Sequence, residues 1–262
     1  MSIKIATWNV NSIKMRADHV EDWLKKEQPD ILFLQELKGT DFPAARYEAL
    51  GYHCRISAQK TYNGVATLSK EKQQVIYDSL PKISEAELDE TPQARYLESE
   101  AFGLRLINIY LPNGNPVDSE KFSYKLKWMD TLYERIDELR RTRIPFVIGG
   151  DFNIIPEDKD CHDPKAWAGD ALFHEESLKQ WRRILYTGLT DAYRVFHNEA
   201  NRYTFWDYQG GAWPQDKGIR IDHFLTSPAV TDRLRGCEID HTPRGWDKPS
   251  DHTPIWIEVA DD

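Results

Sequence analysis

The chain has 262 residues, 40% of them hydrophobic and 12% aromatic, and it carries a formal net charge of −9. No run approaches the roughly 18 apolar residues of a membrane-spanning helix, and the first residues lack the apolar stretch of a signal peptide. Cys54, Cys161 and Cys237 are far apart and form no C-x-x-C pair, which excludes a disulfide framework and a cysteine zinc site. We therefore expect a protein of the reducing cytoplasm that has no membrane partner.

The negative charge by itself argues against a nucleic-acid partner, because phosphate contacts favour basic surfaces. Two considerations weaken this exclusion. A site for a divalent cation collects carboxylates, and the bound ion reverses the local sign of the charge. Basic residues also cluster, since Lys121 and Lys125 stand among aromatic residues, whereas Arg182 and Arg183 are more typical of a solvated face.

Strand-like and helix-like segments alternate along the chain without a linker or a repeat, which predicts one α/β domain over residues 1–262. Apolar runs typical of buried strands cover residues 3–8, 30–34, 104–110, 144–149, 220–224 and 254–259. Apolar residues at helical spacing cover residues 17–26, a long segment that starts near Ser119, and residues 175–185.

The motif Gly150-Asp151-Phe152-Asn153 follows the predicted strand at residues 144–149. Side chains two apart on a strand face the same way, so we expect Asp151 and Asn153 to point together beyond the end of the sheet. A carboxylate beside an amide suits a reaction that places water and holds an anionic oxygen. Taken alone, the motif is more typical of a strand-end turn, because Asp and Asn favour turns for local reasons.

Similar polar residues stand at the ends of the other apolar runs. These residues are Asn9 and Asn11, Gln35 and Glu36, Tyr110, Asp222 and His223, and Asp251 and His252. One such ending carries little information. Six of them, spread along the chain, predict a single site at one edge of a β-sandwich.

Eight short blocks occur in order from the first residues to the last: TWNVN (7–11), LQELK (34–38), YNGVA (62–66), IYLPNG (109–114), GDFN (150–153), YTFWDY (203–208), GIRIDH (218–223) and SDH (250–252). In these blocks the chain resembles the exonuclease III family of AP endonucleases, which belongs to the endonuclease/exonuclease/phosphatase superfamily. The resemblance covers essentially the whole chain. It implies a four-layer α/β sandwich, with two packed β-sheets flanked by helices and the active site at one end of the sheets.

The resemblance also implies a metal site. Glu36 would be the principal ligand of Mg²⁺, with Asn9 beside it and Asp251 nearby. Ligands that offer only oxygen suit a hard divalent cation such as Mg²⁺ or Mn²⁺.

The resemblance assigns the catalytic side chains residue by residue. Asp151 would orient or deprotonate the attacking water, while Asn153 and Tyr110 would hold the phosphate oxygens. His252 would stabilise the phosphoryl charge, and Asp222 would orient the His252 ring. Whether His252 or Asp151 is the general base stays open at this point.

For DNA, the resemblance implies a pocket that accepts an extruded, baseless sugar and leaves no room for a base. The pocket would be lined by Phe205, Trp206, Ile219 and Ile221, although core packing is the alternative for Phe205 and Trp206. Trp213 would wedge into the duplex. The remaining DNA contacts would be Asn11 and Arg220, with Lys121 and Lys125 at the backbone phosphates.

One segment departs from the family pattern, and another resembles a second metal-binding loop. Phe173 and His174 stand where many relatives have a small residue, and their bulk would block an internal abasic nucleotide while admitting a 3′ terminus. Residues 157–163 are rich in acids but lack the spacing and the glycine of a calcium loop, so we expect a solvated loop there.

The expected function is that of a Mg²⁺-dependent DNA-repair phosphodiesterase, acting as a monomer at abasic sites or blocked 3′ termini of duplex DNA. The alternative is a 3′-phosphatase or 3′-exonuclease with weak abasic-site incision. A more remote alternative is a small-molecule or lipid phosphodiesterase of the same superfamily. A silent DNA-binding module is disfavoured, because no expected catalytic residue is missing.

Overall fold

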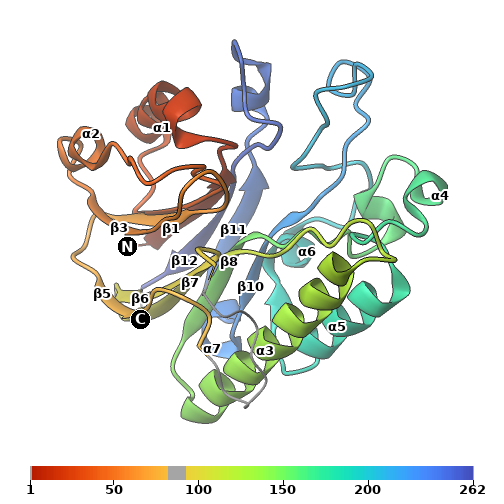
Figure 1. Cartoon of the computed structure of the whole chain (residues 1–262). Helices are drawn as coiled ribbons and strands as arrows, with labels where there is room; N and C mark the ends of the chain where they lie inside the picture. The colour runs from red at the N-terminus through yellow and green to blue at the C-terminus, as the bar shows by residue number, and fades with distance from the viewer. Residues whose placement is uncertain (1, 82–92, 262) are drawn as a thin grey trace.

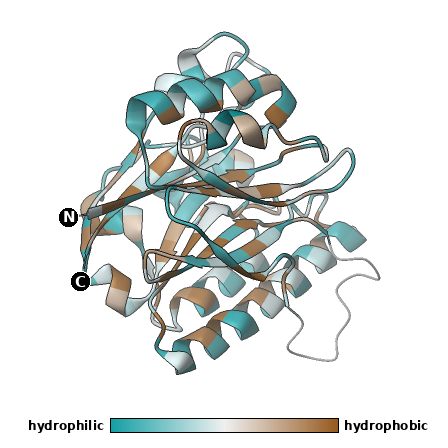
Figure 2. Ribbon diagram, turned by 90° about the vertical axis from the view of Figure 1, so that its left-hand side faces the viewer, coloured by the Kyte–Doolittle hydropathy of each residue, from teal (hydrophilic) through white to brown (hydrophobic). Residues whose placement is uncertain are grey.

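The computed structural model describes residues 2–81 and 93–261. In this part of the chain two six-stranded sheets pack face to face, and helices cover both outer faces (Figure 1). Figure 2 shows the four layers from the side, with apolar residues concentrated where the layers meet. The predicted four-layer α/β sandwich is confirmed.

The first sheet joins strands from both ends of the chain. Its order is β11-β12-β1-β2-β4-β3, in which β1 and β2 are parallel and the other neighbours are antiparallel. Its strands are β1 (Ser2–Asn9), β2 (Ile31–Gln35), β3 (His53–Ser57), β4 (Val65–Ser69), β11 (Leu234–Ile239) and β12 (Ile255–Ala260). Every residue of β2 is buried, because β2 is covered on both faces.

The second sheet has the order β5-β6-β7-β8-β10-β9, in which only β7 and β8 are parallel among its described strands. Its strands are β5 (Gln74–Tyr77), β6 (Tyr96–Ala101), β7 (Leu104–Tyr110), β8 (Phe146–Asp151), β9 (Thr190–Asp191) and β10 (Asp222–Thr226). The strand predicted at residues 104–110 has the same bounds as the observed strand β7. Each of the other five predicted strands begins and ends within two residues of an observed strand.

The helices lie outside the sheets. The outer face of the first sheet packs against α1 (Ile13–Glu27) and α2 (Ala44–Glu48), and that of the second against α3 (Glu120–Thr142) and α5 (Glu175–Leu185). The shorter helices are α4 (Pro164–Trp167), α6 (Ala192–Phe196) and α7 (Pro228–Thr231), with 3₁₀ turns at η1 (Asp158–Asp160) and η2 (Thr242–Gly245). The prediction for α5 is confirmed, while α1 begins earlier than predicted, at Ile13.

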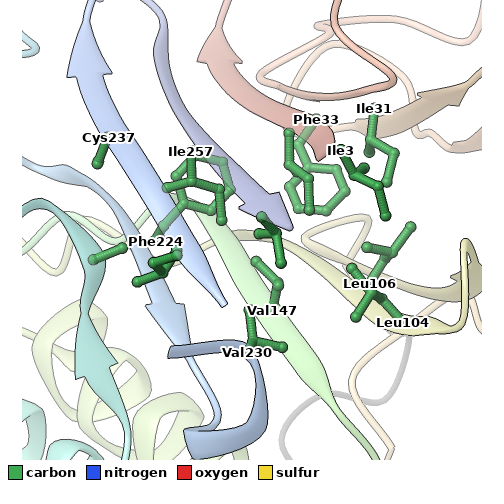
Figure 3. Close-up of a cluster of buried hydrophobic side chains, with 14 of the residues drawn as sticks. Ile3, Ile31, Phe33, Leu104, Leu106, Val147, Phe224, Val230, Cys237 and Ile257 are labelled. Atoms are coloured by element: carbon green, nitrogen blue, oxygen red, sulfur yellow. The ribbon is translucent and has the colours of Figure 1, made fainter. Parts of the chain in front are cut away.

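The central core lies between the two sheets (Figure 3). Phe33 of β2 and Ile257 of β12 meet Leu106 of β7 and Val147 of β8 there. Because side chains alternate across a strand, Leu32 and Leu34 of β2 pack instead against α1 and α2. This burial on both faces fixes the strand register, and with it the position of the residues at the strand ends.

The loop at residues 157–163 differs from the expectation of a solvated loop. Glu157 and Asp158 are exposed, but Asp160 is fully buried and accepts a 2.6 Å hydrogen bond from Nε of Arg220. Cys161 is also buried, in a backbone bridge with Ile219. The loop is thus anchored to the segment that precedes β10 by an ion pair that its sequence did not reveal.

None of the helices in the described part of the chain combines the length and the apolar character that crossing a bilayer requires.

Candidate active site

The polar residues at the strand ends meet at one edge of the two sheets. The carboxyl ends of β1, β2, β7 and β8 lie at this edge, together with the first residues of the antiparallel strands β10 and β12. In the second sheet, Asp151 is the register partner of both Tyr110 and Asp222. A cavity of about 300 Å³ opens there and is lined by Glu36, Tyr110, Asn113, Asn115, Asp151, Asn153, Trp167, Asp170, Leu172, Phe205, Asp207, Ile221, Asp251 and His252.

Asp151 is at the centre of this cavity. Its Oδ1 accepts the backbone N–H of Asn153 at 2.9 Å, and its Oδ2 accepts the side-chain amide of Asn9 at 2.9 Å. Burial raises the pKa of Asp151 to about 7, although the nearby His252 acts in the opposite direction. A carboxyl with such a pKa changes protonation near neutral pH, as a general base requires.

Asp151 and Asn153 line the same cavity, but strand alternation is not the reason. The strand β8 ends at Asp151, and Asn153 has a left-handed backbone with φ +47°. Asn tolerates this conformation better than most residues. The turn directs the Asn153 side chain back to the cavity, where its Nδ2 donates to the carbonyl of Leu111 at 2.8 Å.

His252 and Asp222 form a buried pair. Nδ1 of His252 lies 2.8 Å from Oδ2 of Asp222, and Nε2 of His252 lies 3.8 Å from Oδ2 of Asp151. Burial would lower the pKa of His252, but the carboxylates of Asp222 and Asp151 outweigh it and raise this pKa to about 10. The imidazole is therefore a cation at neutral pH, and the edge of the Phe205 ring packs against it.

Tyr110 is a neutral donor at the cavity wall. Burial, reinforced by Glu36 and Asp151, holds the pKa of its phenol well above the usual value. The guanidinium of Arg95 stacks over the ring at 4.7 Å from its centre. The phenol therefore keeps its proton and can donate a hydrogen bond to an anion.

Glu36 and Asp251 offer carboxylate oxygens, which are the ligands that a hard divalent cation takes, and their role as metal ligands stays a prediction. Both carboxylates line the cavity, where Glu36 accepts from Nδ2 of Asn9 at 2.9 Å and Asp251 accepts from Nδ2 of Asn11 at 2.9 Å. Asn9 turns its amide N–H group to Glu36 and Asp151, while its oxygen accepts the backbone N–H of Asn11. In this arrangement Asn9 bridges two carboxylates, and its role as a metal ligand stays a prediction.

Of the four residues predicted to line a sugar pocket, Phe205 and Ile221 lie on the cavity wall. Trp206 and Ile219 are buried behind it, each with about 1% of its surface exposed. Trp206 donates from Nε1 to Asp216 at 3.0 Å, and the half-buried Trp213 packs against it edge-on. Core packing, the alternative for Phe205 and Trp206, therefore describes Trp206.

Two basic residues expected to contact DNA are in the protein interior. Lys125 is fully buried under the cavity, and its Nζ donates to the backbone carbonyls of Asn113 and Asn153. Arg220 is fully buried and bonds Asp160 and Asp191. The predictions that Lys125 reaches backbone phosphates and that Arg220 contacts DNA are therefore wrong.

Phe173 and His174, the residues of the predicted gate, do not line the cavity. Phe173 is half-buried and packs against an apolar cluster that includes Leu172. His174 caps α5 by accepting the N–H of Glu176, and it packs against Phe122. The residue of this segment that lines the cavity is Leu172, with Trp167 beside it.

Sequence reasoning missed several polar residues of the site. Asn113 and Asp207 lie within two of the eight family motifs, but no catalytic or binding role was predicted for them. Asn115 and Asp170 lie between the motifs. Asn115 donates to both oxygens of Asp170, at 3.0 and 3.1 Å. The position of Asn113 after the end of β7 was an available signal.

A second groove of about 740 Å³ adjoins the cavity and shares Glu36, Tyr110, Asn113 and Asn115 with it. Its other lining residues are Lys38, Gln59, Tyr62, Asn63, Gln93, Arg95, Pro112, Gly114, Glu120, Lys121 and Tyr124. Lys121 is exposed here, so its predicted contact with backbone phosphates stays a prediction. The same is true of Asn11, which bonds Asp251 and Tyr208.

The chain is similar to several known nucleases. Residues 6–252 match the model of the Endonuclease/Exonuclease/phosphatase family. The exodeoxyribonuclease III of Haemophilus influenzae is 34% identical over 98% of this chain and 99% of its own. A solved 3′ phosphatase from Neisseria, bound to a product DNA hairpin, is 40% identical with a TM-score of 0.93 and covers 98% of this chain and 99% of its own. A solved AP endonuclease from Archaeoglobus fulgidus is 37% identical with a TM-score of 0.91 and covers 99% of this chain and 100% of its own.

These likenesses extend over nearly all of both chains in each pair, and metal dependence is general in the family. They confirm the predicted resemblance and, with it, the prediction of a hydrolytic DNA-repair nuclease. The chain belongs to the endonuclease/exonuclease/phosphatase family, with exodeoxyribonuclease III and AP endonucleases among its relatives.

Proposed function

We propose that this protein hydrolyses phosphodiester bonds of duplex DNA at abasic sites and at blocked 3′ termini, with Mg²⁺ as its metal ion. One observation carries the proposal: a single cavity combines anion-binding and water-activating groups with an apolar wall. The expectations of a single domain, a monomer and a cytoplasmic location stay predictions.

The pair of Asp151 and His252 supports a division of roles. Because the pKa of His252 is raised to about 10, its ring is protonated at neutral pH and cannot accept a proton from water. Asp151, with a pKa raised to about 7, is the better general base. We therefore assign the activation of the attacking water to Asp151 and the stabilisation of phosphoryl charge to His252. Asp222 orients the ring of His252.

Neutral donors complete the anion site. The protonated phenol of Tyr110 and the second amide hydrogen of Asn153 are available to phosphoryl oxygens. Glu36 and Asp251 would hold the metal ion, with Asn9 beside them. When bound there, Mg²⁺ supplies Lewis-acid stabilisation of phosphoryl charge.

The apolar residues of the cavity support a DNA substrate whose sugar carries no base. Trp167, Leu172, Phe205 and Ile221 face the polar groups across a cavity of about 300 Å³. We expect a deoxyribose without a base to pack on this apolar wall, and an attached base to add bulk that the wall excludes. Since Phe173 does not line the cavity, its bulk gives no reason to expect weak incision at internal abasic sites.

Dominant 3′-phosphatase activity is the second candidate, because a 3′ phosphatase from Neisseria is 40% identical to this chain. Two labelled duplexes separate the candidates, one with an internal abasic-site analogue and one with a nick that carries a 3′-phosphate. Each is assayed with Mg²⁺, with Mn²⁺ and with chelator. Metal-dependent turnover of both supports the proposal, and turnover of the 3′-phosphate alone supports the second candidate.

Matched variants connect the activity to this cavity. Glu36→Gln and His252→Asn should abolish turnover, whereas Glu48→Gln and His53→Asn change exposed residues of the same types and should not affect it. Hydrolysis of inositol phosphates or sphingomyelin with no turnover of either duplex would refute the proposal in favour of the remote alternative.

A further inference from the structure

Lys125 of α3 lies directly beneath the cavity and touches two of the segments that form it. Its Nζ donates to the carbonyl of Asn153 at 2.6 Å and to that of Asn113 at 3.0 Å. The Lys125 side chain is fully buried and contributes no atom to the cavity wall. Asn113 lies beyond the end of β7 and Asn153 beyond the end of β8, so one side chain joins the two strand-end segments.

The stem of Lys125 also supports the backbone at Gly114. A Cβ atom at position 114 would lie 2.6 Å from Cδ of Lys125 and 3.3 Å from Cβ of Ala171. Gly114 has φ +92°, a conformation that other residues rarely adopt. Glycine therefore allows the segment that follows Asn113 to lie directly on the lysine.

Hydrogen bonds lead from these two segments to the general base. Nδ2 of Asn113 donates to Oδ1 of Asn153 at 3.2 Å, and the backbone N–H of Asn153 donates to Oδ1 of Asp151 at 2.9 Å. A displacement of either segment would change the direction of the Asp151 carboxylate. Misplacement of a reacting group by about 1 Å costs roughly 100-fold in rate.

We propose that Lys125 is a positioning residue of the hydrolytic reaction, which holds the Asn113 and Asn153 segments in the arrangement that directs Asp151 at its water. The inference rests on the proposed function. Lys125 acts through the backbone of its two partners and contacts neither substrate nor metal ligand. It extends the site to α3, a helix that supplies none of the catalytic groups.

The protonation state of Lys125 does not alter this role. Burial lowers its pKa to about 7, against the opposing effects of Asp151 and Asp170. An ammonium group offers three donors and a neutral amine offers two, so both carbonyls keep their hydrogen bonds in either form. The contacts that matter are therefore the two bonds themselves.

The test measures single-turnover cleavage of the nicked 3′-phosphate duplex with enzyme in excess. Lys125→Met keeps the length of the side chain but removes both donors, and Lys125→Arg restores donors. Lys127→Met is the matched control, an exposed lysine of the same helix. The single-turnover rate constant should fall roughly 100-fold in Lys125→Met, recover substantially in Lys125→Arg and stay unchanged in Lys127→Met.

The rate constant at saturating enzyme separates positioning from a general loss of structure, because partial unfolding lowers the concentration of active enzyme and leaves the saturated rate constant unchanged. The dependence on enzyme concentration should also show unchanged DNA affinity in Lys125→Met. A wild-type rate constant in Lys125→Met overturns this inference alone, whereas an inactive wild-type enzyme overturns the proposed function with it. If Lys125→Met does not fold, Lys125→Gln replaces it under the same criterion.

Discussion

Nδ1 of His252 lies 2.8 Å from Oδ2 of Asp222, and both side chains are buried. Asp222 is held in turn by its backbone N–H, which donates to the hydroxyl of Thr204 at 3.1 Å. The pair directs the other ring nitrogen of His252 at Asp151. One carboxylate thus fixes both the orientation and the charge of the imidazole.

Replacing Asp222 should narrow the pH range of activity from the alkaline side. The carboxylates of Asp222 and Asp151 together raise the pKa of His252 to about 10, so wild-type activity should decline only near that pH. In Asp222→Asn the pKa of His252 falls and the alkaline limb moves to lower pH. The measurement is kcat/KM between pH 6 and 11, with the exposed Asp232→Asn as control. An alkaline limb at the wild-type pH in Asp222→Asn would contradict this role.

The acidic limb should report Asp151. Because its pKa is raised to about 7, activity should fall as the pH decreases below that value and the carboxylate takes up a proton. Asp151→Asn keeps the size of the side chain but cannot accept the proton, and we expect kcat to fall by roughly 100- to 10,000-fold. If Asp151→Asn keeps the wild-type kcat, the general base is another group.

Leu172 should contribute to the selection against a base. Removing its side chain enlarges the recess next to Phe205 and Ile221. In Leu172→Ala, the ratio of kcat/KM for an abasic site to that for an intact 3′ nucleotide should fall by roughly 10-fold, as expected for a few methylene groups in an apolar pocket. Phe173→Ala is the control, because Phe173 is adjacent in the chain but does not line the cavity. An equal effect of both variants would argue against a wall formed by Leu172.

Arg220 should stabilise the fold rather than bind DNA. Its guanidinium bonds Asp160 and Asp191 in the interior, so Arg220→Met removes the cation that the two buried carboxylates share and leaves Arg194 as the ion-pair partner of Asp160. We expect a loss of about 3–5 kcal/mol in the free energy of unfolding, measured with urea. Arg183→Met breaks an exposed pair with Asp130 and should cost less than about 1 kcal/mol. A comparable small loss in both variants would show that the buried network contributes little.

Lys121 should contribute to DNA binding through charge. It is exposed in the groove beside the cavity, where one phosphate contact would release about 0.9 of a counterion. Lys121→Met should weaken DNA binding and reduce the slope of log K against log salt concentration by about that amount. Lys72→Met changes an exposed lysine beyond the opposite end of β4 and should leave the slope unaltered. An unaltered slope in Lys121→Met would show that Lys121 does not contact a phosphate of the DNA backbone.

The sequence by itself determined the α/β class and the edge that carries the site, and the four layers were implied by the family resemblance. The buried strand β2 begins as a continuous apolar run, and the polar residues that follow it stand out because a strand ends where its pattern changes. The helix α5 could be bounded from its pattern for the same reason. These features depend on residues close together in the chain, which is the information that periodicity contains.

Only the tertiary structure decided which residues of a motif face the cavity and which support it. Lys125 stands three residues after Phe122 and four before Met129, within the buried stripe of α3, yet its charge suggested the surface. Arg220 and Asp160 neutralise each other across 60 residues of chain, and the cavity wall uses Leu172 rather than Phe173. Whether a charge is buried depends on a partner distant in sequence, and which of two adjacent residues lines a cavity depends on how a loop packs. Local sequence contains neither.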